Sequence, residues 1–264
     1  MKTLELVADD LVYPESPRWR DGRLWISDVH AYRLVTVDSS TTEVVCEVPG
    51  RPAGSGFLPD GTLLLATALD RRLNVWDGLE LRTVAEVPAT GLLNDMVVSP
   101  DGRAWFGDTG FRLGVEDPRP GRIFTYTVAE GPKIAAEDVW FPNGMVITGS
   151  ELVVNESTVD RTSVFEILPD GTLRRDRVLV EPGPFPDGLA MDTDGSYWIA
   201  LFGGGKFVHV NAGGEVLEEI DTDGRIAVAC AFGGGSLYLC TAETTMADLR
   251  EGRSRGYVQQ LSNV

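Results

Sequence analysis

The sequence has little cysteine, little positive charge and no long apolar run. Its 264 residues contain only Cys46, Cys230 and Cys240, which are too few and too scattered for a disulfide framework, and none forms a CxxC pair. We expect reduced thiols in a cytoplasmic protein. The longest apolar runs, such as residues 63–69, fall far short of a membrane span. The opening segment turns acidic by Glu5 and lacks the apolar stretch of a signal peptide.

The charge balance argues against nucleic-acid and membrane partners. Lys and Arg number 23 against 40 Asp and Glu, which gives a net charge of −17. Such a surface repels nucleic-acid phosphates and anionic lipids, whereas it favours capture of a cation. We therefore expect neither a nucleic-acid nor a membrane partner. An acidic surface of this kind suits a monomer or a weak homodimer.

Motifs of several common enzyme classes are also lacking. Residues 54–56 do not have the spacing of a GxSxG nucleophile elbow. The only histidines, His30 and His209, form no HExxH arrangement. For His30 the sequence favours a surface or packing role over a place in a pocket. Residues 203–206 lack the Walker spacing and are better interpreted as a hairpin.

One phrase, a tight turn followed by an alternating apolar strand, recurs along the chain. It is clear at residues 19–28, 58–67, 99–108 and 192–201, and weaker at 148–157 and 233–242. The turn glycines or their equivalents are Gly22, Gly61, Gly102, Gly149, Gly195 and Gly234. They lie 39, 41, 47, 46 and 39 residues apart. Strand repeats at this period, without a helical stripe, are typical of β-propellers.

The repeat length therefore predicts the fold. Six repeats of about 44 residues account for almost the whole chain. No linker or charge block interrupts them. We predict an all-β, six-bladed β-propeller that forms a single domain over residues 1–264. The alternative is a β-sandwich whose turns have this spacing by coincidence.

Four polar residues share one phase of the repeat. Glu15, Asn94, Asn143 and Asp187 lie six to eight residues before their turn glycines. Equivalent phases of successive blades lie on one ring around the axis of a propeller, so these side chains should converge at one mouth of the channel. Each Pro-Asn-Gly or Pro-Asp-Gly could alternatively be an ordinary turn. Glu15 does not have a turn context, which favours convergence.

The chemistry of this set favours a metal ion. Carboxylates gathered in a narrow channel are costly unless a cation compensates them. Two carboxylates and two amides form an oxygen-only set, which suits Ca²⁺ or Mg²⁺ better than a soft-ligand zinc site. Repeats two and six place small or apolar residues at this phase, at 53–56 and 227–230. The ring is therefore polar on one side, which leaves room for a substrate.

At these positions the sequence resembles the SMP-30/gluconolactonase/LRE-like family of six-bladed propellers. The resemblance extends from ESPRW at residues 15–19 to residues 230–242, and its core is an early Glu, an Asn-Asp pair, an Asn-Gly and a Pro-Asp-Gly. It implies a metal-dependent hydrolase, chiefly a lactonase. It also implies one divalent cation, Ca²⁺ first, with Mg²⁺, Mn²⁺ or Zn²⁺ as alternatives.

The resemblance also implies roles for individual residues. Glu15, Asn143 and Asp187 match the metal ligands, and Asp187 matches the general base. Asn94 matches a residue that contacts substrate or a bound water, so the Asn94-Asp95 pair is a candidate substrate-binding element. Many sugar lactonases of the family have an Arg two residues before this Asn, where this chain has Leu92. The Leu92 side chain cannot hydrogen-bond sugar hydroxyls, which argues against a gluconolactone-like substrate. Alternatively, Leu92 is ordinary packing and says little about the substrate.

We therefore predict a divalent-metal-dependent hydrolase of a small-molecule lactone. Alternatives are a metal-dependent hydrolase of another activated bond, of the organophosphate or ether type, a non-enzymatic Ca²⁺-stabilised binding propeller, or a strictosidine-synthase-like condensing enzyme. Two further features of the sequence each have two alternative interpretations. The irregular segment at residues 111–122 is either a lid or a surface loop. The acidic residues that end three predicted strands either line the channel or are solvated edges, and they are Asp28, Asp108 and Glu156.

Overall fold

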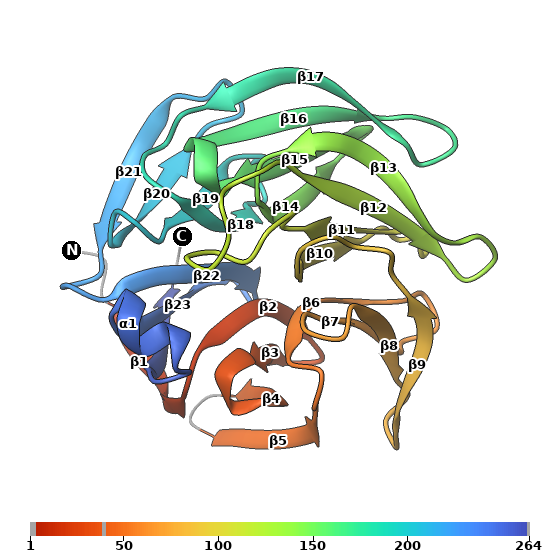
Figure 1. Ribbon diagram of the computed structural model, residues 1–264. Helices are drawn as coiled ribbons and strands as arrows, with labels where there is room; N and C mark the ends of the chain where they lie inside the picture. Colours follow the sequence, from red (N-terminus) through yellow and green to blue (C-terminus); the bar gives the residue numbers. More distant parts are fainter. Residues whose placement is uncertain (1–3, 39–40, 263–264) are drawn as a thin grey trace.

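A computed structural model describes residues 4–38 and 41–262. The chain forms six four-stranded antiparallel sheets arranged around a central axis (Figure 1). The prediction of a six-bladed β-propeller is therefore confirmed. All six turn glycines of the repeat have positive φ, between 58° and 93°. Each follows the innermost strand of a blade, where glycine adopts this conformation without steric cost.

The innermost strands surround the axis. They are β2 (Pro14–Arg20), β6 (Pro52–Phe57), β10 (Leu93–Val98), β14 (Pro142–Thr148), β18 (Pro186–Met191) and β22 (Ile226–Gly233). Each contacts the innermost strand of the next blade, and β22 contacts β2, so the ring closes. The beginnings of these strands therefore meet at one end of the axis.

The other strands lie progressively further from the axis. The second strands are β3 (Arg23–Asp28), β7 (Leu63–Thr67), β11 (Ala104–Asp108), β15 (Glu151–Glu156), β19 (Tyr197–Leu201) and β23 (Ser236–Glu243). The third strands are β4 (Arg33–Asp38), β8 (Arg72–Trp76), β12 (Gly121–Thr127), β16 (Arg161–Ile167), β20 (Lys206–Val210) and β24 (Arg255–Ser262). The outermost strands are β5 (Thr41–Glu47), β9 (Leu81–Glu86), β13 (Gly131–Val139), β17 (Leu173–Val180), β21 (Val216–Asp221) and β1 (Leu4–Leu11).

Helical structure is sparse. The helix α1 (Met246–Arg250) lies between the last two strands, and 3₁₀ turns follow two second strands at Val29–Ala31 and Ser157–Val159. None of the helices in the described part of the chain is long and apolar enough to cross a membrane.

The sixth blade contains both ends of the chain. Its outermost strand is β1, which pairs antiparallel with β24 from Leu4–Leu261 to Leu11–Gly256. The repeat pattern did not predict this pairing, because β1 precedes the first turn and has no repeat of its own. The pairing of β1 with β24 ties the first blade to the last, since the chain passes directly from β1 into β2.

The core lies between the blades. Every residue of β7, β11 and β19 is buried, because these second strands are covered on both faces by neighbouring blades. One cluster joins Leu64 and Ala66 of the second blade to Phe106 and Phe124 of the third. Burying such side chains contributes roughly 1.5–3 kcal/mol each. The ring is therefore held by apolar contacts between sheets.

Glycines allow the innermost strands to approach one another. A Cβ atom on Gly54 would lie 2.3 Å from the backbone nitrogen of Met96, and one on Gly144 would lie 2.3 Å from that of Leu189. Gly188 is similarly crowded by the next blade. These contacts are with backbone atoms, which cannot swing aside. Larger residues would therefore force the blades apart.

We predict that Gly144→Ala destabilises the protein by about 1–3 kcal/mol, because the added methyl group overpacks the contact between β14 and β18. Urea unfolding monitored by tryptophan fluorescence would measure the change. Gly149→Asn is the control, since Gly149 has a positive φ of 58° in open space and Asn tolerates that conformation. An equal loss of stability in both variants would contradict the role of close approach.

Candidate active site

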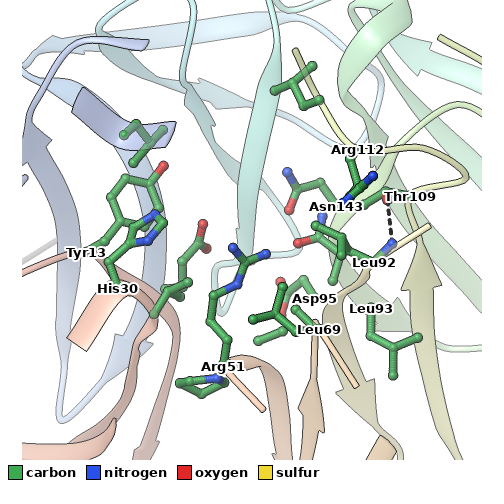
Figure 2. Close-up of a pocket in the computed structure, with 18 of the residues that line it drawn as sticks. Tyr13, His30, Arg51, Leu69, Leu92, Leu93, Asp95, Thr109, Arg112 and Asn143 are labelled. Carbon is green, nitrogen blue, oxygen red and sulfur yellow. Dashed lines mark hydrogen bonds between the residues drawn. The ribbon is translucent and has the colours of Figure 1, made fainter. Parts of the chain in front are cut away.

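A cavity of about 600 Å³ lies where the innermost strands of the first five blades begin (Figure 2). A volume of this size is within the range of small-molecule sites. Glu15, Asn94, Asn143 and Asp187 all line it. The closure of the ring thus brings together the four polar residues that the repeat phase placed on one ring. We call these four, with Ala53 of the second blade, the first ring.

A second ring of side chains lies two residues earlier in each blade. In five blades the carbonyl at this position accepts a hydrogen bond of 2.8–3.2 Å from the residue that follows the second strand. The repeated bond shows that the five positions are equivalent. They are Tyr13, Arg51, Leu92, Phe141 and Phe185, and all five line the cavity.

The second ring gives the cavity two different sides. Leu92, Phe141 and Phe185 form an apolar wall on the side of the third, fourth and fifth blades. A chain of ring contacts at 5.3–5.7 Å extends this wall from Phe111 through Phe141 and Phe185 to Phe202. The opposite side carries Tyr13, Tyr32, His30 and Arg51. A ligand in this cavity therefore meets hydrocarbon on one side and polar groups on the other.

Glu15 and Asp187 are two buried carboxylates, and no arginine or lysine in the described part of the chain forms an ion pair with either. Burial raises the pKa of Glu15 well above its usual value, and the Asp187 carboxylate raises it further. Burial likewise raises the pKa of Asp187, with an added contribution from Asp95. Asp187 Oδ1 is buried and accepts no hydrogen bond from the described residues. Such orphaned oxygen atoms are expected where a ligand completes the site.

The two asparagines direct their amide nitrogens into the fold. Asn94 Nδ2 donates to the carbonyl of Pro142 at 3.0 Å. Asn143 Nδ2 donates to Ser157 Oγ at 3.2 Å, and Ser157 Oγ in turn donates to Pro186 O at 2.7 Å. The two amide oxygens accept no hydrogen bond from the described residues, and the Asn143 amide also lies near enough to Asp187 to lower the pKa of its carboxyl. Oxygen is the ligand type that hard divalent cations prefer.

The first ring suits a hard cation because its donor atoms are oxygens, and not because it contains many charged side chains. Among residues 4–38 and 41–262, no group of three or more His, Cys, Asp and Glu side chains could hold a metal ion. The first ring instead combines two carboxylates with two amides. The raised pKa values and the orphaned Oδ1 of Asp187 are consistent with a place that a cation would fill.

The other two predicted substrate-binding residues also line the cavity. Asp95 Oδ1 accepts hydrogen bonds of 2.8 Å from Arg18 Nη2 and from Met96 N, so this oxygen is already used by the protein. Leu92 contributes its side chain to the apolar wall, and its backbone nitrogen donates to Thr109 Oγ1 at 3.0 Å.

Neither sequence-based interpretation of Asp28, Asp108 and Glu156 was right, because all three carboxylates are buried and satisfied within the fold. Asp28 accepts from the backbone nitrogens of residues 12 and 13 at 2.8–2.9 Å. Asp108 accepts from those of residues 90 and 91 at 2.7–2.8 Å. Each carboxylate therefore holds the loop that leads into an innermost strand and so positions the two rings.

Glu156 does the same for the fourth blade. It accepts from Trp140 N at 2.9 Å and also contacts Arg161, Arg175 and Ser163. Burial by itself would raise the pKa of Glu156, but the hydrogen bonds from the two arginines and the serine lower it to about 2. Glu156 is therefore a charged structural residue.

The sequence analysis missed much of the second ring. Tyr13, Arg51, Phe141 and Phe185 carry no motif, although the same phase argument applied two residues earlier would have found them. His30, for which a surface or packing role was favoured, packs edge-on against Tyr13 at 5.4 Å and also lines the cavity. Burial, with a contribution from Arg51, lowers the pKa of His30 to about 4.

The irregular segment at residues 109–120, between β11 and β12 of the third blade, is part of the cavity wall. Phe111 is fully buried and anchors the segment against Phe141. Arg112, Leu113 and Val115 line the cavity mouth. Most of residues 112–119 are exposed, so the segment borders the cavity from the solvent side.

Residues 13–243 match the family model described as the SMP-30/Gluconolactonase/LRE-like region. The chain belongs to this family. The pentonolactonase of Haloferax volcanii is 28% identical to it over 86% of this chain and 81% of its own length. The 6-deoxy-6-sulfogluconolactonase of Pseudomonas putida is 28% identical over 88% of this chain and 83% of its own length.

Solved structures show the SMP-30/gluconolactonase/LRE-like fold independently. A luciferin-regenerating enzyme superimposes with a TM-score of 0.85 at 18% identity, covering 99% of this chain and 95% of its own. A gluconolactonase from Xanthomonas campestris gives a TM-score of 0.79 at 21% identity, covering 98% and 89%. At these identities the likeness concerns the fold.

We predict that Glu156→Gln lowers the free energy of unfolding by about 3 kcal/mol at neutral pH, because it removes the charge that two arginines contact. The folded pKa of Glu156 lies below its ordinary value, so the stabilisation is present above about pH 4.5 and is lost as pH falls towards 2. Urea unfolding of both proteins at about pH 7 and about pH 3 would measure the difference in their free energy of unfolding, which should be smaller at the lower pH.

The control is Glu166→Gln, since Glu166 is exposed and pairs with Arg174 on the surface of the same blade. It should cost less than about 1 kcal/mol. A Glu156→Gln effect that is small, or that does not change with pH, would contradict the structural role.

Proposed function

We propose that this protein hydrolyses a lactone with the help of one divalent cation, Ca²⁺ being the first candidate. The observation that carries the proposal is the convergence of Glu15 and Asp187, two buried carboxylates with raised pKa values, with Asn94 and Asn143 in one cavity. The lactonase names of the two curated relatives support the reaction class.

The cation would be held by Glu15, Asn143 and Asp187. The chemistry that a divalent cation supplies in such a site is polarisation of a carbonyl group and stabilisation of the negative charge that develops during attack by water. The protein supplies the rest. Asn94, fixed by its bond to Pro142, would orient the substrate or the attacking water, and the apolar wall would exclude other water from the ring.

Asp187 is the proposed general base. Its Oδ1 is buried and accepts no hydrogen bond from the described residues, so this oxygen is available to accept a proton. It would take a proton as water attacks the carbonyl carbon and return a proton to the ring oxygen as the C–O bond breaks. The product is then the open-chain hydroxy acid.

The apolar wall bears on the substrate. Leu92, Phe141 and Phe185 offer no hydrogen-bonding side chains to a ligand. Each hydroxyl group buried against them without a partner would cost roughly 1–3 kcal/mol. We therefore propose a lactone with few hydroxyl groups on the side that faces this wall, rather than gluconolactone itself.

A panel of γ- and δ-lactones, both aliphatic and sugar-derived, tests this proposal by proton release. We expect turnover that disappears on chelation and returns with one divalent cation. Lightly hydroxylated lactones should exceed gluconolactone in kcat/KM by roughly tenfold or more, from the cost of one unpaired hydroxyl. Absence of turnover with every lactone and cation would contradict the proposal.

The same assay tests Asp187. We expect Asp187→Asn to lower kcat by roughly 10²–10⁴-fold, because the amide cannot accept the proton. Asp176→Asn is the matched control, since Asp176 is exposed on the outermost strand β17, and it should keep wild-type turnover. Substantial residual activity of Asp187→Asn in the presence of saturating cation would exclude the general-base role.

A further inference from the structure

Arg51 is a cation in the cavity wall that the proposed reaction does not use. It precedes β6 and has a left-handed backbone with φ of 65°. The same conformation occurs at the equivalent Phe141 and Phe185, at 55° and 53°. Figure 2 shows the Arg51 side chain reaching into the cavity, with its guanidinium group drawn between His30 and Asn143. Left-handed backbone at non-glycine residues is often retained at functional sites.

The guanidinium group of Arg51 has no partner in the described part of the chain. Its Nε is buried and makes no hydrogen bond there. No Asp or Glu among those residues forms an ion pair with it, although Glu15 lies near enough to influence its pKa. Burial lowers the pKa of Arg51 from its ordinary value, while Tyr32 and Glu15 act in the opposite direction. A guanidinium group nevertheless stays charged in proteins.

Other arginines near the cavity do not share this state. Arg112 is exposed, and its Nε lies 3.0 Å from Glu116 Oε1. Arg250, at the mouth, is exposed to solvent. Arg71, in the same blade as Arg51, donates to the carbonyl of Ala89 at 2.7 Å and so has a structural use. Arg51 alone among these four is both partly desolvated and unpaired.

The charge balance of the cavity points the same way. Asp95 is compensated by Arg18. A divalent cation would compensate Glu15 and Asp187, and this leaves the charge of Arg51 in excess by one. An uncompensated cation in a partly desolvated place is unfavourable. One negative charge on the ligand would balance it.

We propose that Arg51 binds an anionic group of the substrate, best a carboxylate, and is the residue that sets specificity in the proposed lactonase site. The planar guanidinium fork matches a carboxylate with two parallel hydrogen bonds. This inference rests on the proposed function only in taking the substrate to be a lactone. The anion site itself does not depend on it.

The position of Arg51 fixes where the acidic group lies. Arg51 belongs to the polar side with Tyr13 and Tyr32, opposite the wall of Phe141 and Phe185. The substrate is therefore an amphipathic lactone, with a carboxylate towards the second blade and a largely apolar ring towards the fourth and fifth. Lactones of dicarboxylic acids have this chemistry.

A matched pair of lactones tests the assignment. 5-Oxotetrahydrofuran-2-carboxylate and γ-valerolactone differ by a carboxylate in place of a methyl group. In the wild type, kcat/KM should favour the carboxylate. Arg51→Met should lower the ratio of the two kcat/KM values by roughly 10–100-fold, the value of hydrogen bonds to a charged group. Comparing the ratio between proteins cancels the different intrinsic reactivities of the two lactones.

Arg72→Met is the control, because it removes an equal charge from the same blade that is paired with Asp70 and Glu86 and does not line the cavity. It should leave the ratio within about twofold, as expected for a surface pair. An unchanged ratio in Arg51→Met, or an equal fall in Arg72→Met, would overturn the assignment. Partial recovery of the ratio in Arg51→Lys would support it.

A binding measurement separates this inference from the proposed function. Calorimetry with cyclopentanecarboxylate and cyclopentylmethanol, which cannot be hydrolysed, needs no turnover. The wild type should bind the carboxylate more tightly than the alcohol, and Arg51→Met should lose roughly tenfold or more of this preference. A wild type without the preference would overturn the anion site. Binding through Arg51 with no hydrolysis of any lactone would support the anion site and contradict the lactonase proposal.

Discussion

The constraint on which the rest of this structure depends is the closure of six sheets into one ring. Closure forces the beginnings of the innermost strands together, so Glu15 and Asp187, 172 residues apart in the chain, face one cavity. Burial raises both pKa values, with the Asp187 charge adding to the shift of Glu15 and the Asp95 charge adding to that of Asp187. The apolar contacts between blades must outweigh this unfavourable pair when the site is empty. A bound cation would turn the same arrangement from a cost into a source of stability.

Acidic residues serve two opposite purposes at this end of the propeller. Asp28, Asp108 and Glu156 are fully buried, yet each accepts backbone or arginine hydrogen bonds that stabilise its charge. They fix the loops from which the site residues project. Glu15 and Asp187 face the cavity with fewer donors, and Asp187 Oδ1 has none among the described residues. The number of hydrogen-bond donors separates these two from the structural carboxylates, which explains why residue type alone did not.

Much of the fold and part of the site could be predicted from the sequence, for one physical reason. A repeat of 39–47 residues fixes both the number of blades and the phase at which side chains meet the axis. The phase located Glu15 and Asp187 without a known motif. It could not show that β1 joins β24, because this pairing links the two ends of the chain. Nor did it identify Arg51, whose importance comes from the lack of a partner, and this is visible only once every neighbour is placed.

The two rings divide the work of recognition. The first ring combines carboxylates and amides, and in the proposed reaction it would hold the cation and face the reacting ester. The second ring lies two residues earlier and differs strongly between blades, from Arg51 to Leu92, Phe141 and Phe185. Because the hydrogen bonds that hold these positions use their backbone atoms and not their own side chains, the side chains can change without disturbing the propeller. A single scaffold can therefore keep one reaction while the second ring changes the polarity and charge of the substrate. In this chain the second ring places the unpaired guanidinium group of Arg51 opposite the apolar wall of Leu92, Phe141 and Phe185.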